Sequence, residues 1–142
     1  MKLRPAALVV VAVLAVATSA VAAVAWRRGS PPRPASASLQ VTAEPGMRFG
    51  DRVPGPVLRV KAGRPVRLVL QNRDALQHDL WVVQAGERAP YLEPAFPGAK
   101  TALLEPGQRQ EIQFTPTRPG RYRYVCTVPG HDATMFGELI VE

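Results

Sequence analysis

The spacing of prolines and glycines after residue 38 limits the fold of this chain more than any other feature. Of the 15 prolines and 11 glycines in the 142 residues, 11 prolines and 10 glycines lie between residues 39 and 142. Both residue types interrupt helices, so only short uninterrupted runs remain. No run in this part carries a convincing 3.6-residue apolar period, which argues against a helical domain.

Alternating apolar residues mark the strands that we expect to bury one face. The alternating positions are Val66, Leu68 and Leu70, then Ile112 and Phe114, then Tyr122, Tyr124 and Cys126. Further strands are expected at 57–60, 78–83 and 137–141, and a long proline-containing loop at 84–100. Short strands separated by turns are typical of an antiparallel sandwich. The sequence therefore predicts an all-β fold, a β-sandwich, for residues 39–142.

A long apolar segment precedes this domain. The 21 residues from 6 to 26 are interrupted only by one threonine and one serine. As a helix they would span about 31 Å, close to the roughly 30 Å of a bilayer core. Small-x-small triplets near the end also suit a signal peptidase, so residues 1–28 are predicted to be a hydrophobic helix acting as a signal anchor or a cleaved signal peptide. Residues 29–38, rich in proline, serine and alanine, are predicted to be a linker.

The formal net charge of +7 does not indicate a nucleic-acid binder. Residues 1–38 contain five basic and no acidic side chains, whereas residues 39–142 contain 13 basic and 11 acidic ones. Nucleic-acid binding needs a clustered basic surface, and a nearly balanced domain does not predict one. We therefore expect no nucleic-acid partner, and we expect the domain to be a monomer.

Three possible metal ligands lie within ten residues near the end of the chain. Cys126, His131 and Met135 have the spacing C-x4-H-x3-M, around a Pro-Gly turn between two expected strands. Taken singly, each residue type is more often a packing residue than a ligand. A thiolate, an imidazole and a thioether together suit copper, and a trigonal copper site needs one more imidazole. The other histidine of the chain is His78.

These residues resemble the cupredoxins, the type 1 blue-copper proteins, with an azurin- or plastocyanin-like ligand loop. The resemblance covers roughly residues 57–142. Besides the ligand loop, the matching landmarks are Val60–Val66, Asn72 followed by His78 and Asp79, Phe114–Pro116, and Pro119–Tyr122.

The resemblance implies a Greek-key β-sandwich that binds one copper ion at one end. It implies His78, Cys126 and His131 as equatorial ligands and Met135 as a weak axial ligand. His131 would be the partly exposed ligand through which electrons enter and leave.

The resemblance also implies a set of contacts around the thiolate. The backbone amide of Val128 should point at the sulfur, and Pro129 should leave the sulfur without a further donor. The family often has asparagine after the first ligand histidine, where this chain has Asp79. Aspartate can accept a hydrogen bond from Thr127 but cannot donate as asparagine does.

We therefore expect a carrier of single electrons, not an enzyme, that works between redox proteins such as a cytochrome or a terminal oxidase. It would be attached to the cell membrane by its N-terminal helix, with the domain on the extracytoplasmic side, or periplasmic or secreted after cleavage. The alternative is copper storage or delivery to an oxidase, because the same ligands could serve both roles. An open copper enzyme site is disfavoured because the chain has one cysteine and two histidines.

Overall fold

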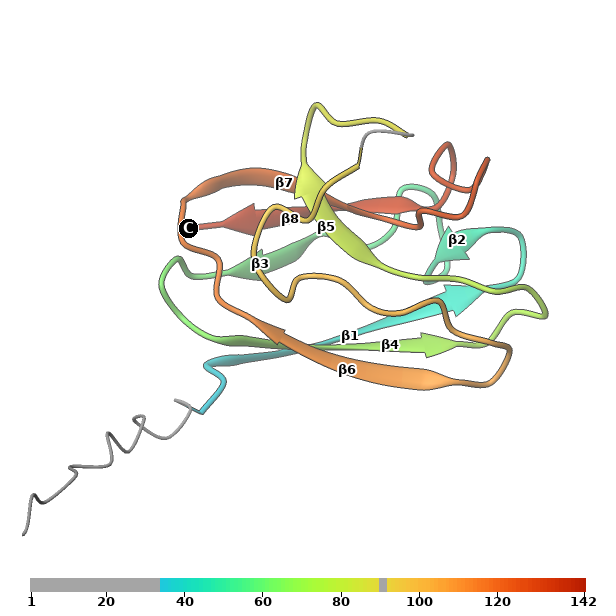
Figure 1. Ribbon diagram of the computed structural model, residues 1–142, viewed down its shortest axis with the longest axis horizontal. Coiled ribbons are helices and arrows are strands. Elements are labelled where there is room, and N and C mark those ends of the chain that lie inside the picture. Colours follow the sequence, from blue (N-terminus) through green and yellow to red (C-terminus); the bar gives the residue numbers. More distant parts are fainter. Residues whose placement is uncertain (1–33, 90–91) are drawn as a thin grey trace, which may run out of the picture. The chain divides into compact units, whose positions relative to one another are not determined.

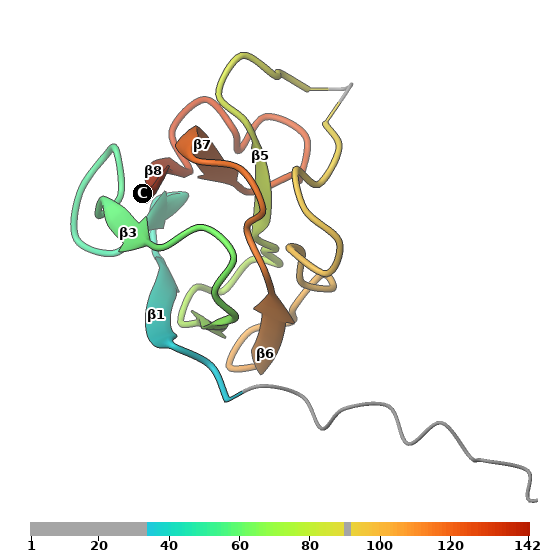
Figure 2. The ribbon, with the colours of Figure 1, turned by 90° about the vertical axis from the view of Figure 1, so that its left-hand side faces the viewer.

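Eight strands form two four-stranded sheets in the computed structural model, which describes residues 34–89 and 92–142. The first sheet has the order β2-β1-β4-β6, with β1 Ala37–Glu44, β2 Arg48–Phe49, β4 Val66–Asn72 and β6 Arg109–Phe114. The second has the order β3-β8-β7-β5, with β3 Leu58–Val60, β5 Trp81–Gln84, β7 Gly120–Val125 and β8 Phe136–Val141. Figures 1 and 2 show the sheets as two facing layers. The predicted all-β sandwich is confirmed, but it is not purely antiparallel, because β1 pairs in parallel with β4 and β3 pairs in parallel with β8.

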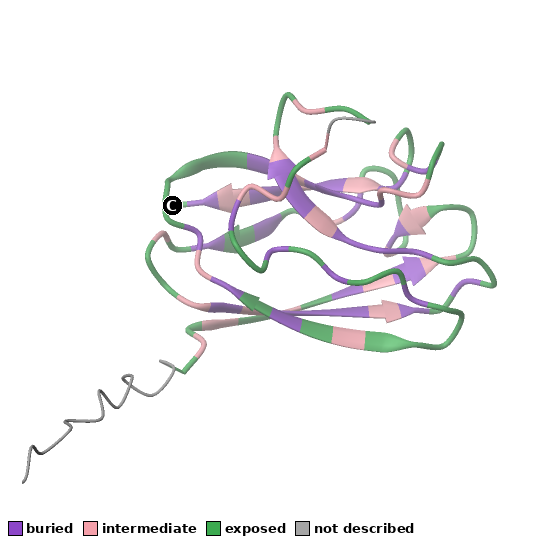
Figure 3. Cartoon of the chain, viewed as in Figure 1, coloured by how far each residue is buried: buried purple, intermediate pink, exposed green. Residues whose placement is uncertain are grey.

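The core lies between the sheets and follows the predicted alternation (Figure 3). Val66, Leu68 and Leu70 of β4 are all fully buried. Val66 pairs with Phe114 and Leu68 with Ile112 across the antiparallel β4–β6 ladder, so apolar residues face the core in register. The long loop before β6 also contributes Phe96 to the core. Its ring centroid lies 4.7 Å from that of Tyr122 and 6.2 Å from that of Phe114.

Two strand predictions need correction. Strand β1 begins at Ala37, inside the predicted linker, because residues 37–43 pair in parallel with β4. The strand expected at 78–83 is Trp81–Gln84 instead. His78 instead forms an isolated bridge with Leu104, through two backbone hydrogen bonds of 3.1 and 2.8 Å. Residues 78–80 are therefore an irregular segment that comes before the second sheet.

The expected N-terminal helix and residues 29–33, which are half of the predicted linker, lie outside the described residues. In the part of the chain that the structure describes, no helix is long and apolar enough to cross a membrane.

Candidate metal centre

His78, Cys126 and His131 meet at one end of the sandwich although they come from different segments. Cys126 directly follows β7, His131 lies in the turn that leads to β8, and His78 lies between β4 and β5. One possible ligand atom from each residue lies within 4.8 Å of the other two, and all three residues are buried. The sequence prediction that these three residues come together is confirmed.

The spacing of the three atoms fits a small metal ion. Cys126 Sγ lies 3.8 Å from His78 Nδ1 and 3.7 Å from His131 Nδ1, and the two nitrogens are 3.2 Å apart. A point equidistant from the corners of that triangle lies about 2.1 Å from each. Zinc, which follows copper in the first transition row, binds imidazole nitrogen at about 2.0–2.1 Å and thiolate sulfur at about 2.3 Å. The side chains are therefore arranged as ligands without further movement.

The ligand loop is closed by its own backbone hydrogen bonds. The amide of Cys126 donates to the Met135 carbonyl over 3.0 Å, and the Met135 amide donates to the His131 carbonyl over 2.7 Å. Gly130 has φ of +84°, a left-handed conformation that glycine adopts without a Cβ clash. Met135 is fully buried in the same core cluster as Cys126. The loop thus holds the thioether residue beside Cys126 and His131.

Burial controls the protonation of the cysteine. It raises the pKa of the Cys126 thiol to about 12, while backbone hydrogen bonds from the amides of Asp79 and Val128 act in the opposite direction. The lowering effect of the Val128 amide agrees with the prediction for this residue. The larger lowering effect comes from Asp79 in the other ligand loop, which the sequence did not predict.

The Asp79 carboxylate ties the two ligand loops together. The Thr127 amide donates to Asp79 Oδ1 over 2.6 Å, and the Thr127 hydroxyl donates to the other carboxylate oxygen. The prediction that Asp79 accepts from Thr127 is confirmed. Aspartate therefore joins the His78 segment to the Cys126 segment by accepting two hydrogen bonds.

Asp74 is a residue of the site that the sequence reasoning missed. Its Oδ2 lies 2.9 Å from Nε2 of His78, and only 8% of its surface is exposed. Burial works to raise the pKa of Asp74, but hydrogen bonds from His78 and from the Ala75 amide outweigh it and hold that pKa below its ordinary value. A metal-binding histidine commonly donates its second ring N–H to a carboxylate. Asp74 could have been found as a candidate on this ground, because it is the nearest acidic residue that precedes His78 in the sequence.

His131 is the least buried of the four ligands. It is 9% exposed, whereas His78 is fully buried. Burial and the neighbouring His78 lower the pKa of His131, which favours the neutral imidazole that binds metals. The prediction of a partly exposed second histidine agrees with this difference.

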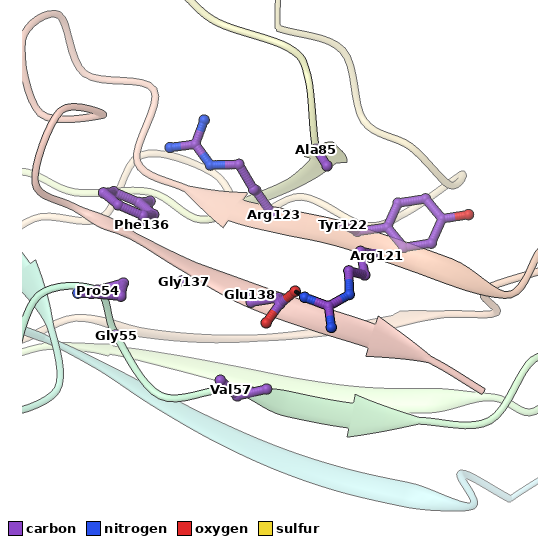
Figure 4. A pocket seen from close by; sticks show the side chains of 10 residues that line it. All are labelled: Pro54, Gly55, Val57, Ala85, Arg121, Tyr122, Arg123, Phe136, Gly137 and Glu138. Carbon is purple, nitrogen blue, oxygen red and sulfur yellow. Dashed lines mark hydrogen bonds and ion pairs between the residues drawn. The ribbon is translucent and has the colours of Figure 1, made fainter.

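A groove on the outer face of the second sheet is separate from the metal ligands. Its lining includes the apolar side chains of Val57, Ala85 and Phe136 and the Arg121–Glu138 ion pair of 2.9 Å (Figure 4). None of the four predicted ligands lines it.

Comparison with known proteins agrees with this geometry. The family described as "Cupredoxin-like domain" matches residues 6–141. The chain belongs to this family. Its cupredoxin-like site consists of His78, Cys126, His131 and Met135, which form a type 1 copper site.

Three similar proteins define the closer resemblance. Auracyanin-A of Chloroflexus aurantiacus is 33% identical over 103 residues, which are 59% of this chain and 63% of the auracyanin, so the chain spans less than two thirds of that relative. The copper-resistant cuproprotein CopI of Pseudomonas aeruginosa is 30% identical over 181 aligned positions, 99% of this chain and 97% of that protein. The crystal structure of dithionite-reduced auracyanin from Roseiflexus castenholzii has a TM-score of 0.62 and 26% identity, covering 76% of this chain and 98% of that one.

Proposed function

We propose that this cupredoxin carries single electrons between redox proteins. The observation that supports the proposal is the preformed, buried ligand cluster, of which His131 is the least buried member. Copper bound there supplies one-electron chemistry by cycling between its monovalent and divalent states. The closed ligand loop and the Asp79–Thr127 contacts hold the side chains in place, so little of the protein has to rearrange.

The surface beside the ligand loop suits a redox partner. A hollow beside the ligand loop is lined by Trp81, Leu92, Thr127 and Pro129, most of which are apolar. Charged side chains on the domain nearly balance, so we expect apolar contact to contribute more than long-range steering. A cytochrome or a terminal oxidase is the class of partner that we propose.

Copper loading tests the site. The full-length protein with one equivalent of Cu(II) should become intensely blue and show a small copper hyperfine splitting in electron paramagnetic resonance. The Cys126→Ser variant should lose both signals, because the thiolate is replaced by a hydroxyl. A colourless wild-type protein with an ordinary tetragonal copper spectrum would contradict the proposal.

Copper storage or delivery is the second candidate function. It is favoured by the similarity to CopI along almost the whole chain, because that protein is named copper-resistant. Two assays separate the candidates. A carrier should exchange electrons rapidly with a cytochrome and keep its copper, whereas a delivery protein should transfer Cu(I) to a metal-free acceptor protein at a faster rate than simple dissociation allows.

We also propose that the N-terminal segment places the domain on the extracytoplasmic side of the membrane. The support is the apolar run of residues 6–26 followed by a proline-rich stretch. Mass spectrometry of the native protein after cell fractionation tests this. A full-length mass in the membrane fraction indicates an anchor, and a shortened mass in a soluble extracytoplasmic fraction indicates cleavage. A full-length mass in the cytoplasm would contradict both.

A further inference from the structure

The two ring nitrogens of His78 face different groups. Nδ1 faces the metal-binding space, 3.8 Å from Cys126 Sγ and 3.2 Å from His131 Nδ1. Nε2 faces away from it, 2.9 Å from Oδ2 of Asp74. Because a ring nitrogen that binds a metal carries no proton, the single proton of neutral His78 must lie on Nε2. It is then donated to the Asp74 carboxylate.

The carboxylate is held in this position by the chain around it. Asp74 Oδ1 accepts from the Ala75 amide over 2.6 Å, and the Asp74 amide donates to Asn72 Oδ1 over 3.0 Å. Asn72 is fully buried and donates to the carbonyls of Leu76 and Leu104 over 2.8 and 3.0 Å. The Asp74 side chain therefore cannot swing towards water without breaking its hydrogen bonds to Ala75 and His78.

The two histidines of the site differ in whether the outer ring nitrogen contacts a carboxylate. Within residues 34–89 and 92–142, the ring of His131 makes its polar contacts through Nδ1 alone. Only His78 combines full burial with a carboxylate on its outer nitrogen. A negative charge next to a buried ligand is screened weakly, and a hydrogen-bonded carboxylate makes the imidazole more electron-rich. Both effects stabilise divalent copper more than monovalent copper.

We propose that Asp74 is a positioning residue that fixes the tautomer of His78 and lowers the reduction potential of the bound copper. This inference rests on the proposed one-electron function. Asp74 contacts no metal itself and acts through His78. Loss of such a carboxylate partner typically lowers metal affinity by about 10- to 100-fold. If only the affinity for divalent copper falls, a tenfold decrease raises the reduction potential of the one-electron couple by about 59 mV.

The decisive experiment compares Asp74→Asn with Asp132→Asn in the full-length copper protein. Both variants remove one negative charge, but Asp132 only neighbours His131 in sequence and is partly exposed. We expect voltammetry to give a higher potential for Asp74→Asn, corresponding to at least a tenfold loss of Cu(II) affinity relative to Cu(I), and a smaller shift for Asp132→Asn. Equal shifts in the two variants, or none, would overturn the inference.

A measurement on the unmutated protein keeps the test valid if Asp74→Asn does not fold. In Cu(I)-loaded wild-type protein, proton and nitrogen NMR should find a strongly downfield His78 Nε2–H that exchanges slowly with water. A rapidly exchanging proton without that shift would refute the role of Asp74. Failure of the proposed function is a separate result, because it would appear as a wild-type protein with no type 1 spectrum or no reversible couple.

Discussion

Raising the pH should tighten metal binding by an unusually large factor, because burial keeps the Cys126 thiol protonated. The pKa of the thiol is raised from its ordinary 9.0 to about 12. Metal binding needs the thiolate and so releases this proton, which means that the apparent affinity rises with pH as long as the metal-free thiol stays protonated. Because the pKa of His131 is lowered from its ordinary value of 6.5, this imidazole is already neutral at pH values above 6.5.

The expected magnitude follows from the thiolate fraction. With a pKa of about 12, this fraction rises about tenfold for each pH unit, so affinity should rise about 100-fold between pH 8 and pH 10. With a pKa of 9.0 the fraction would rise from about 0.09 to about 0.91, a change of only about tenfold. The two cases therefore differ by about a factor of ten.

Zinc is a suitable redox-inert probe for this measurement. Its affinity for the metal-free protein can be measured at each pH by competition with a chelator of known proton and metal equilibria. Cys126→Ser is the control, and its affinity should change little across the same range because serine does not ionise there. A wild-type affinity that levels off above pH 9 would refute the argument that burial holds the thiol protonated.

Two further predictions concern packing and polar contacts around the site, each measured by chemical denaturation of the metal-free protein. Gly137→Ala should destabilise by about 3 kcal/mol or more, because its Cβ would lie 2.1 Å from Cζ and the hydroxyl oxygen of the fully buried Tyr124. Gly86→Ala, with no atom within 4 Å of its Cβ, should change stability by less than about 0.5 kcal/mol, and equal losses in the two variants would contradict the clash. Thr127→Val should cost about 1.5–3 kcal/mol because the buried Asp79 carboxylate loses the hydroxyl donor, whereas Thr127→Ser should retain most of the stability. A serine variant as unstable as the valine one would show that the hydroxyl contributes little.

The parts of the fold that were predictable are those where one strand carries its own pattern. Val66, Leu68 and Leu70 are separated by the half-buried Arg67 and by Val69. The structure buries these three side chains between the sheets, in register with β6. In β1 the outer half alternates between exposed and half-buried positions, and full burial begins only at Val41. Its place is decided by parallel pairing with β4, a partner more than 20 residues away. Such a strand gives a weak local signal.

The ligand set could be predicted because sulfur and nitrogen ligands lie together in a short loop. The contacts that Asp74 and Asp79 make with the ligands could not be predicted. Asp74 precedes His78 by four residues in a loop without helical period, so no face or register relates them in the sequence. Their contact depends on Asn72, which turns the chain after β4 by bonding to Leu76 and Leu104. The second amide at the sulfur, from Asp79, depends on the same crossing between sheets. Contacts between separate loops need the tertiary fold to be known.

The division of the ligands between two loops explains why the site can be rigid. Cys126, His131 and Met135 belong to one hairpin connection that is closed by backbone hydrogen bonds, so their spacing is set locally. His78 comes from the crossing between the sheets, and its distance to the others depends on the Asp79–Thr127 contacts that join the loops. Movement of His78 away from the other ligands would require breaking those part-buried contacts. The fold therefore resists rearrangement at the one ligand that the hairpin does not hold.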